Sequence, residues 1–201
     1  ECEYGDLFNF IHSDIRLGIA KAKNVCLDNL KGCDYIFLFD DDCFPKRFAW
    51  EDCYISASSM SGVEYMNWMR PDVPNHLFVK NEYQDIIEYN NCMGVLQFFT
   101  KNAAEILEGF DERFLIYGFE HAEIANRAFT LELTNGYGPY IAPLECNDYI
   151  YTIDMDYDHL KVPIPLGGEI ICRSSLSAEE KDIYIKENSK VFEGIINARN
   201  K

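Results

Sequence analysis

The feature that most constrains this chain is a short apolar run that ends in three consecutive aspartates. Residues 34–39 read Asp-Tyr-Ile-Phe-Leu-Phe, and Asp40, Asp41 and Asp42 follow directly. A nearly unbroken apolar run of this length predicts a strand buried on both faces, as central parallel strands are. In open α/β sheets, ligands bind beyond the carboxyl ends of the strands, so the three aspartates are predicted to lie at a functional site.

Further elements are predicted on both sides of this strand. Apolar residues recur at three- and four-residue steps through Ile15, Ile19, Ala22, Cys26 and Leu30, which predicts a helix that stops at Gly32. The other predicted helices are one capped by Asn102 and ended by Gly109, one over 119–131 that buries Ile124, Ala125, Ala128 and Phe129, and one over 177–198 opened by a capping box of Ser177 and Glu180. Predicted strands or extended segments cover residues 7–11, 54–57, 92–100 and 139–144.

The order strand–helix–strand at the start of the chain is the signature of an α/β fold. We therefore expect the 201 residues to form one domain, a mixed sheet flanked by helices. Its core is expected over residues 5–160, with a C-terminal helical extension over 165–201. No apolar run approaches the roughly 20 residues that a membrane span needs.

Charge and cysteine usage narrow the classes of partner and compartment. The formal net charge of −16 argues against binding a polyanion over the whole surface. The eight cysteines are dispersed without a C-x-x-C pair, and the chain has no N-x-S/T acceptor for glycosylation. These features favour a reducing, cytoplasmic setting.

The three strand-end aspartates are candidates for metal binding. Adjacent carboxylates repel one another unless a cation or hydrogen-bond donors neutralise them. Carboxylate oxygens suit Mg²⁺ or Mn²⁺, either of which can also bridge a diphosphate. The alternative interpretation is an acidic turn on a solvated surface, and the triplet by itself does not decide between the two.

A second acidic group opens the helix predicted over 119–131. Glu120 lies in its first turn, where the helix dipole favours an anion, so this carboxylate is a candidate general base. Glu123 and Arg127 are four residues apart and are expected to form an ion pair. The alternative is that all three are solvent-facing helix charges.

Four segments together resemble glycosyltransferase family 2 and its relatives with the GT-A fold. They are residues 18–24 (Gly-Ile-Ala-Lys-Ala-Lys-Asn), 34–42 with its D-x-D motif, 93–101, and 109–120 with Gly-Phe-Asp-Glu-Arg-Phe and Tyr-Gly-Phe-Glu. Their order and spacing agree over about residues 5–160. The resemblance implies a GT-A fold and metal-dependent transfer of a sugar from a nucleotide-sugar, expected to be a UDP-sugar, to an acceptor hydroxyl, with inversion.

The resemblance also implies roles for the strand-end residues and the first helix. Asp40 would contact the ribose or base of the donor and, with Asp42, hold Mn²⁺ or Mg²⁺. Asp41 would assist either. His159 is the candidate for a further metal ligand, and Lys23 and Asn24 would lie near the nucleotide.

The catalytic base is expected at the start of the helix over 119–131. His121 stands where the family has a second acidic residue, so the base is either Glu120 or His121. The first strand–helix–strand of the family would precede Leu7, and a partner domain or chain could supply it. The acceptor, whether glycan, protein, lipid or modified nucleic acid, is not indicated. Two alternatives stay open: a degenerate domain that binds a nucleotide-sugar or glycan without turnover, and a metal-dependent nucleotidyltransferase.

Overall fold

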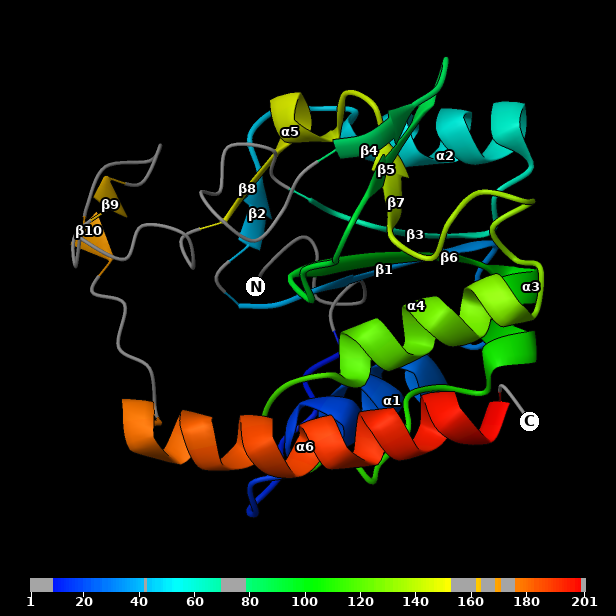
Figure 1. The fold of residues 1–201 in the computed structure, drawn as a ribbon. Helices are drawn as coiled ribbons and strands as arrows, with labels where there is room; N and C mark the ends of the chain where they lie inside the picture. The colour runs from blue at the N-terminus through cyan, green and yellow to red at the C-terminus, as the bar shows by residue number, and fades with distance from the viewer. Residues whose placement is uncertain are drawn as a thin grey trace.

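The structure, a computed structural model, describes residues 9–41, 43–69, 79–152, 162–163, 169–170 and 176–199. Its helices are α1 (Ile19–Asn29), α2 (Trp50–Ser61), α3 (Lys101–Leu107), α4 (Glu120–Thr130), α5 (Cys146–Tyr149) and α6 (Ala178–Arg199). Its strands are β1 (Tyr35–Phe39), β2 (Cys43–Pro45), β3 (Tyr65–Asn67), β4 (Val79–Glu82), β5 (Ile86–Tyr89), β6 (Leu96–Thr100), β7 (Ile141–Pro143), β8 (Ile150–Thr152), β9 (Val162–Pro163) and β10 (Glu169–Ile170). These elements form a mixed α/β fold (Figure 1).

The central sheet has the strand order β1-β6-β3, and both of its strand pairs are antiparallel. The prediction of a parallel strand over residues 34–39 is therefore wrong in direction. Within the described part of the chain, β1 forms one edge of this sheet, and Tyr35 is 40% exposed. The apolar run arises because helices cover both faces of the strand, and this burial carries no information about strand direction.

The two faces of this sheet carry different chemistry. Phe37 and Phe98 face α2, where the ring of Phe37 lies 4.8 Å from that of Trp50 and 5.8 Å from that of Tyr54. Helices α1, α3 and α4 lie on the other side (Figure 1). Side chains alternate along a strand, so Gln97 points to the side opposite Phe98. The α1 side of the sheet therefore receives a polar group, while the α2 side is aromatic.

A second antiparallel sheet, β4-β5-β7, lies beside α2, and its strand β7 contacts both α2 and β3 (Figure 1). Strand β2 pairs with β8, and β9 pairs with β10. Residues 54–57, predicted as a strand, belong instead to α2. Tyr54, Ala57 and Ser58 are its buried residues, and this spacing of three and four is helical. Tyr54 and Ile55 favour strands, but tertiary packing outweighs this preference.

Helix α1 buries a different stripe from the one that its apolar residues predicted. The buried positions are Ala20, Lys23 and Leu27, whereas Ile15 precedes the helix and is 69% exposed. Cys26 is also exposed. The prediction failed because a lysine lies on the buried stripe, which hydrophobic periodicity cannot anticipate.

Three further local predictions can be compared with the structure. The capping box at α6 is confirmed: Glu180 Oε2 accepts from Ser177 N at 2.8 Å, and Ser177 Oγ accepts from Glu180 N at 3.2 Å. The predicted cap of α3 is wrong, because Thr100 rather than Asn102 accepts the hydrogen bond from Ala103 N. Phe129, predicted to be buried, is 45% exposed.

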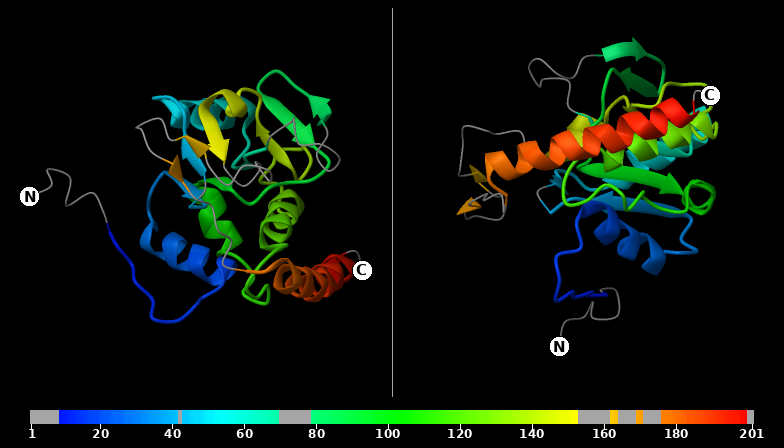
Figure 2. Two further views of the ribbon diagram at one scale, coloured as in Figure 1. Left: turned by 90° about the vertical axis from the view of Figure 1, so that its left-hand side faces the viewer. Right: turned by 60° about the horizontal axis from the view of Figure 1, so that its bottom comes forward.

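Helix α6 lies on the same side of the central sheet as α1 and α4 (Figures 1 and 2). It is 22 residues long, and the predicted division into a core and a C-terminal extension stays a prediction. No helix in the described ranges is both long enough and apolar enough to cross a membrane. The segment predicted as a strand over residues 7–11 has no strand at its described residues, 9–11.

Candidate functional site

Lys23 connects α1 to the end of β1 and to the start of β6. Its Nζ lies 3.0 Å from Asp40 Oδ1, 2.8 Å from the carbonyl oxygen of Gly94 and 3.2 Å from Gln97 Oε1. The residue is 7% exposed. An ammonium group has three N–H donors, and here three acceptors are in reach. This is why a lysine is tolerated on the buried face of α1.

Asp40 reaches the α1 side of the sheet because it continues the alternation of Ile36 and Leu38, both buried. Its backbone N–H donates to the carbonyl oxygen of Val95 at 2.8 Å, which keeps the residue in register beyond the end of β1. The Asp40 side chain is 31% exposed, so part of the carboxylate faces solvent beside Lys23.

The remaining residues of the predicted metal site are not brought together by the described part of the structure. Asp41 is exposed, and Asp42 and His159 lie outside the described residues. Among the described residues, no group of three or more histidine, cysteine, aspartate or glutamate side chains could hold a metal ion. Asp40 offers an oxygen ligand of the kind that Mg²⁺ and Mn²⁺ prefer, but it does not form a metal site alone. Metal binding stays a prediction.

Glu120 and His121, at the start of α4, form a partly buried pair. Glu120 Oε1 lies 3.2 Å from His121 Nδ1. The Glu120 side chain is 4% exposed and that of His121 is 23% exposed. The imidazole is therefore the member of the pair that solvent reaches.

Charges around Glu120 keep it ionised. Burial opposes ionisation, but His121 and its hydrogen bond, together with the Lys23 ammonium, lower the pKa of the carboxyl to about 2. An ionised carboxylate can only accept hydrogen bonds, so His121 Nδ1 is the donor. In the neutral tautomer with its proton on Nδ1, an imidazole has its lone pair on Nε2.

Gly94 joins the Lys23–Asp40 pair to the Glu120–His121 pair. Its carbonyl oxygen accepts from Lys23, and a Cβ atom built on it would lie 3.0 Å from His121 Nδ1. Any larger residue would push the imidazole away. The structure thus gathers the two predicted groups, the strand end and the start of α4, around one glycine; this group of Lys23, Asp40, Gly94, Glu120 and His121 is called the cluster below.

Cys92 lies next to the cluster as a neutral thiol. Burial raises its pKa well above the usual range, and the nearby Glu120 carboxylate raises it further.

The sequence analysis did not identify Gln97, whose side-chain oxygen accepts a hydrogen bond from Lys23. The signal was present, since Gln97 is a polar residue inside an otherwise apolar strand.

Asn24, the other predicted nucleotide contact, is engaged elsewhere. Its Oδ1 accepts from Phe110 N at 2.6 Å, and its Nδ2 donates to Phe110 O at 3.0 Å and to Glu112 Oε1 at 3.1 Å. These bonds fasten α1 to the segment after Gly109. A role in nucleotide binding stays a prediction for both Asn24 and Lys23.

The predicted pair of Glu123 and Arg127 is confirmed, with Oε2 and Nη2 3.0 Å apart. It is buried rather than solvent-facing, since the Glu123 side chain is 1% exposed. Arg127 also donates to the carbonyl oxygens of Leu107 and Gly109, both at 2.6 Å. The guanidinium therefore ties α4 to the end of α3.

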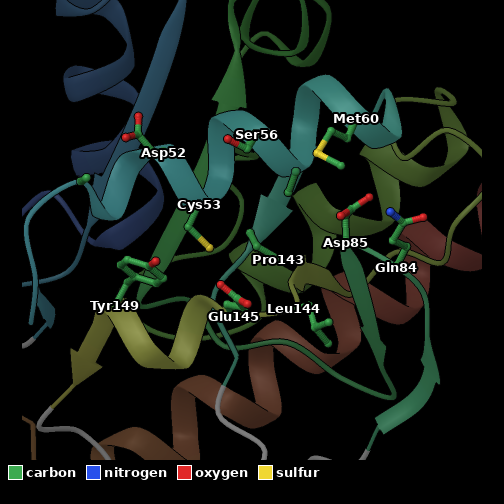
Figure 3. Close-up of a pocket in the computed structure, with 12 residues that line it drawn as sticks. Asp52, Cys53, Ser56, Met60, Gln84, Asp85, Pro143, Leu144, Glu145 and Tyr149 are labelled. Atoms are coloured by element: carbon green, nitrogen blue, oxygen red, sulfur yellow. The ribbon is translucent and has the colours of Figure 1, made fainter.

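A cavity of about 370 Å³ lies elsewhere, between α2, the turn before β5 and the segment that enters α5 (Figure 3). Asp52, Asp85 and Glu145 are among its lining residues, and none of the predicted site residues lines it. Burial, followed by the charges of Glu145 and Asp148, raises the pKa of the Cys53 thiol to about 12. The thiol in this cavity is thus neutral, and the cavity is separate from the cluster.

The chain is similar to a protein described as an uncharacterized glycosyltransferase of Acanthamoeba polyphaga mimivirus. The two are 24% identical over 200 residues, which cover 96% of this chain and 74% of the relative. No family model matches the chain, and no solved structure matches it. The similarity therefore extends over nearly the whole chain.

Proposed function

We propose that this protein transfers a sugar from a nucleotide-sugar donor to an acceptor hydroxyl, with Mn²⁺ or Mg²⁺ bound at the end of β1. The observation that carries the proposal is the cluster, in which a strand-end aspartate and a histidine–carboxylate pair lie around Gly94. The similarity to a mimiviral glycosyltransferase supports the same class of reaction.

The sequence left two candidates for the catalytic base, Glu120 and His121, and we propose that the base is His121. Glu120 is a poor base because its pKa is about 2 and its side chain is buried. Its role is to hold His121 Nδ1–H, which leaves Nε2 to take the proton of the acceptor hydroxyl. The oxygen of that hydroxyl then attacks the anomeric carbon of the donor, and the nucleoside diphosphate leaves with the bonding electrons.

The metal would be held by Asp42 and Asp40, with His159 as a third candidate ligand. When bound, it would offset the negative charge that develops on the leaving diphosphate. Lys23 has a separate proposed role. It holds Asp40 and the Gly94 carbonyl in place, and its charge adds to that of His121 in lowering the pKa of Glu120.

The test is the release of nucleoside diphosphate from a panel of nucleotide-sugars, with Mn²⁺, with Mg²⁺ and with a chelator. We expect metal-dependent release with at least one UDP-sugar, and its loss in Asp42→Ala. Donor binding without release would instead support a degenerate binding domain. Release of pyrophosphate from nucleoside triphosphate and sugar phosphate would support a nucleotidyltransferase.

The variant His121→Asn tests the role of His121 as the base while it keeps the hydrogen bond to Glu120. The asparagine amide can still donate to Glu120 from the position of Nδ1, but it offers no basic Nε2. We expect this variant to bind the donor as the wild type does and to lose turnover. Unchanged turnover would remove His121 from the proposed mechanism.

A further inference from the structure

A buried asparagine on α6 holds the loop that leads into the Glu120–His121 pair. Asn188 is 1% exposed. Its Nδ2 donates to the carbonyl oxygens of Tyr117 and Gly118, at 2.8 and 3.0 Å. Its Oδ1 lies 3.4 Å from the backbone N–H of Leu115. One side chain therefore makes three hydrogen bonds to the loop of residues 115–119.

Other contacts hold the same loop from two sides. On the α6 side, the ring of Phe192 lies 5.5 Å from that of Phe119, and Lys181 Nζ lies 5.3 Å from the ring centre of Tyr117. On the α1 side, Gly18 approaches so closely that an added Cβ would lie 2.5 Å from the carbonyl oxygen of Leu115. The loop thus passes between the start of α1 and the middle of α6, on the side of the sheet that carries the cluster (Figure 2).

The backbone of this loop decides where the catalytic pair points. Gly118 and Phe119 both have positive φ angles, 95° and 71°, and Phe119 is the N-cap of α4. A bulky residue rarely adopts this left-handed conformation unless its surroundings impose it. Glu120 is the next residue, so any relaxation at Phe119 turns both Glu120 and His121 relative to Gly94.

We propose that Asn188 is a positioning residue for the Glu120–His121 pair, and that α6 is thereby part of the catalytic apparatus. This inference rests on the function proposed above for the cluster. Asn188 touches neither side chain of the pair. It acts through the carbonyl groups of Tyr117 and Gly118, which it holds in the orientation that the left-handed turn at Phe119 requires.

The test compares Asn188→Leu, which keeps the shape but removes all three hydrogen bonds, with Ser189→Ala as the matched control. Ser189 is the next residue of α6, and its hydroxyl bonds within the helix to Glu193. We expect kcat of Asn188→Leu to fall about 10- to 100-fold, as displacements of about 1 Å do, with the donor KM unchanged. Ser189→Ala should match the wild type in both constants.

A proton NMR measurement provides a readout that does not depend on turnover. In the wild type, the His121 Nδ1 proton held by Glu120 should give a downfield signal that disappears in His121→Gln. Asn188→Leu should weaken or abolish this signal, and Ser189→Ala should retain it. Asn188→Asp, which keeps an acceptor for Leu115 but cannot donate to both carbonyls at once, should weaken the signal as well and serves if the leucine variant does not fold.

The two readouts separate the failure of this inference from that of the proposed function. A folded Asn188 variant that keeps both the signal and wild-type kcat overturns the positioning role, and so does a wild-type spectrum without the signal. A wild type that shows the signal but no sugar transfer refutes the proposed function alone. The loss of the signal in the Asn188 variants would then still support positioning of the pair.

Discussion

Helix α4 carries two glutamates, one turn apart, that are both buried and both paired, yet the two pairs are built differently. Glu123 faces Arg127, whose charge is permanent and whose other donors bind two backbone carbonyls. Glu120 faces His121, a titratable group that is 23% exposed beside Gly94. The comparison teaches that burial and pairing alone do not identify a functional carboxylate; the partner's chemistry and its exposure do.

The two pairs should therefore respond differently to mutation. Loss of the Glu123–Arg127 pair should chiefly lower the free energy of unfolding. Loss of the basic nitrogen in the other pair should chiefly lower turnover.

Arg127→Leu should destabilise the fold by about 3–5 kcal/mol, because it removes the opposite charge of the Arg127 guanidinium from the buried Glu123 carboxylate. Two carbonyl groups, at Leu107 and Gly109, also lose their donor. Denaturant unfolding measures the change. Arg127→Lys keeps the charge but cannot reproduce the planar set of donors, so it should lose less. A loss below about 1 kcal/mol in Arg127→Leu would show that this pair is not a structural clamp.

His121→Asn should lower kcat by about 10²–10⁴-fold, the usual contribution of a general base. Its free energy of unfolding should fall by less than that of Arg127→Leu, because the asparagine amide can still donate to Glu120 although the charge of His121 is lost. Nucleoside diphosphate release and denaturant unfolding, measured on the same preparation, give both quantities. A large loss of stability without loss of turnover would reverse the proposed contrast between the two pairs.

Acid should weaken the fold through Glu120. The pKa of this carboxyl is lowered from about 4.5 to about 2, so its contribution to stability is present above pH 4.5 and is lost as the pH falls towards 2. The shift corresponds to about 3 kcal/mol. Unfolding free energies measured between pH 5 and pH 2 should fall less steeply in Glu120→Gln than in the wild type. Parallel curves would show that Glu120 is not held ionised by its neighbours.

Thr100→Ala sets the scale for a helix cap outside both pairs. It removes the side-chain cap of α3, together with the hydrogen bond that Thr100 donates to Glu64, and should cost about 1 kcal/mol. Asn102→Ala, at the position that the sequence predicted as the cap, should cost less, because this exposed side chain bonds to Glu64 instead. Equal losses in the two variants would mean that Thr100 is not the dominant cap.

Much of the local structure could be predicted from the sequence. The capping box of Ser177 and Glu180, the buried strand in residues 92–100 and the spacing of Glu123 and Arg127 all depend on neighbours within a few residues. Such interactions are readable because the chain itself fixes the distance between the groups.

The three largest errors share one physical cause. The direction of β1, the helix over residues 50–61 and the buried face of α1 were each decided by partners far along the chain. Lys23 is the clearest case, since its three acceptors come from residues 17, 71 and 74 positions away. The sequence of α1 alone therefore cannot predict that these acceptors surround Lys23.

The sequence by itself determined that aspartates end a buried strand and that acidic residues open a later helix, because alternation and helical spacing are properties of the chain. Only the tertiary structure decided that Asp40, Lys23 and the Glu120–His121 pair meet at Gly94. It also decided that Asn188 holds the loop before Glu120, a contact across some 70 residues. Such contacts exist only once the helices have packed on the sheet, since packing sets which distant polar groups share a buried space.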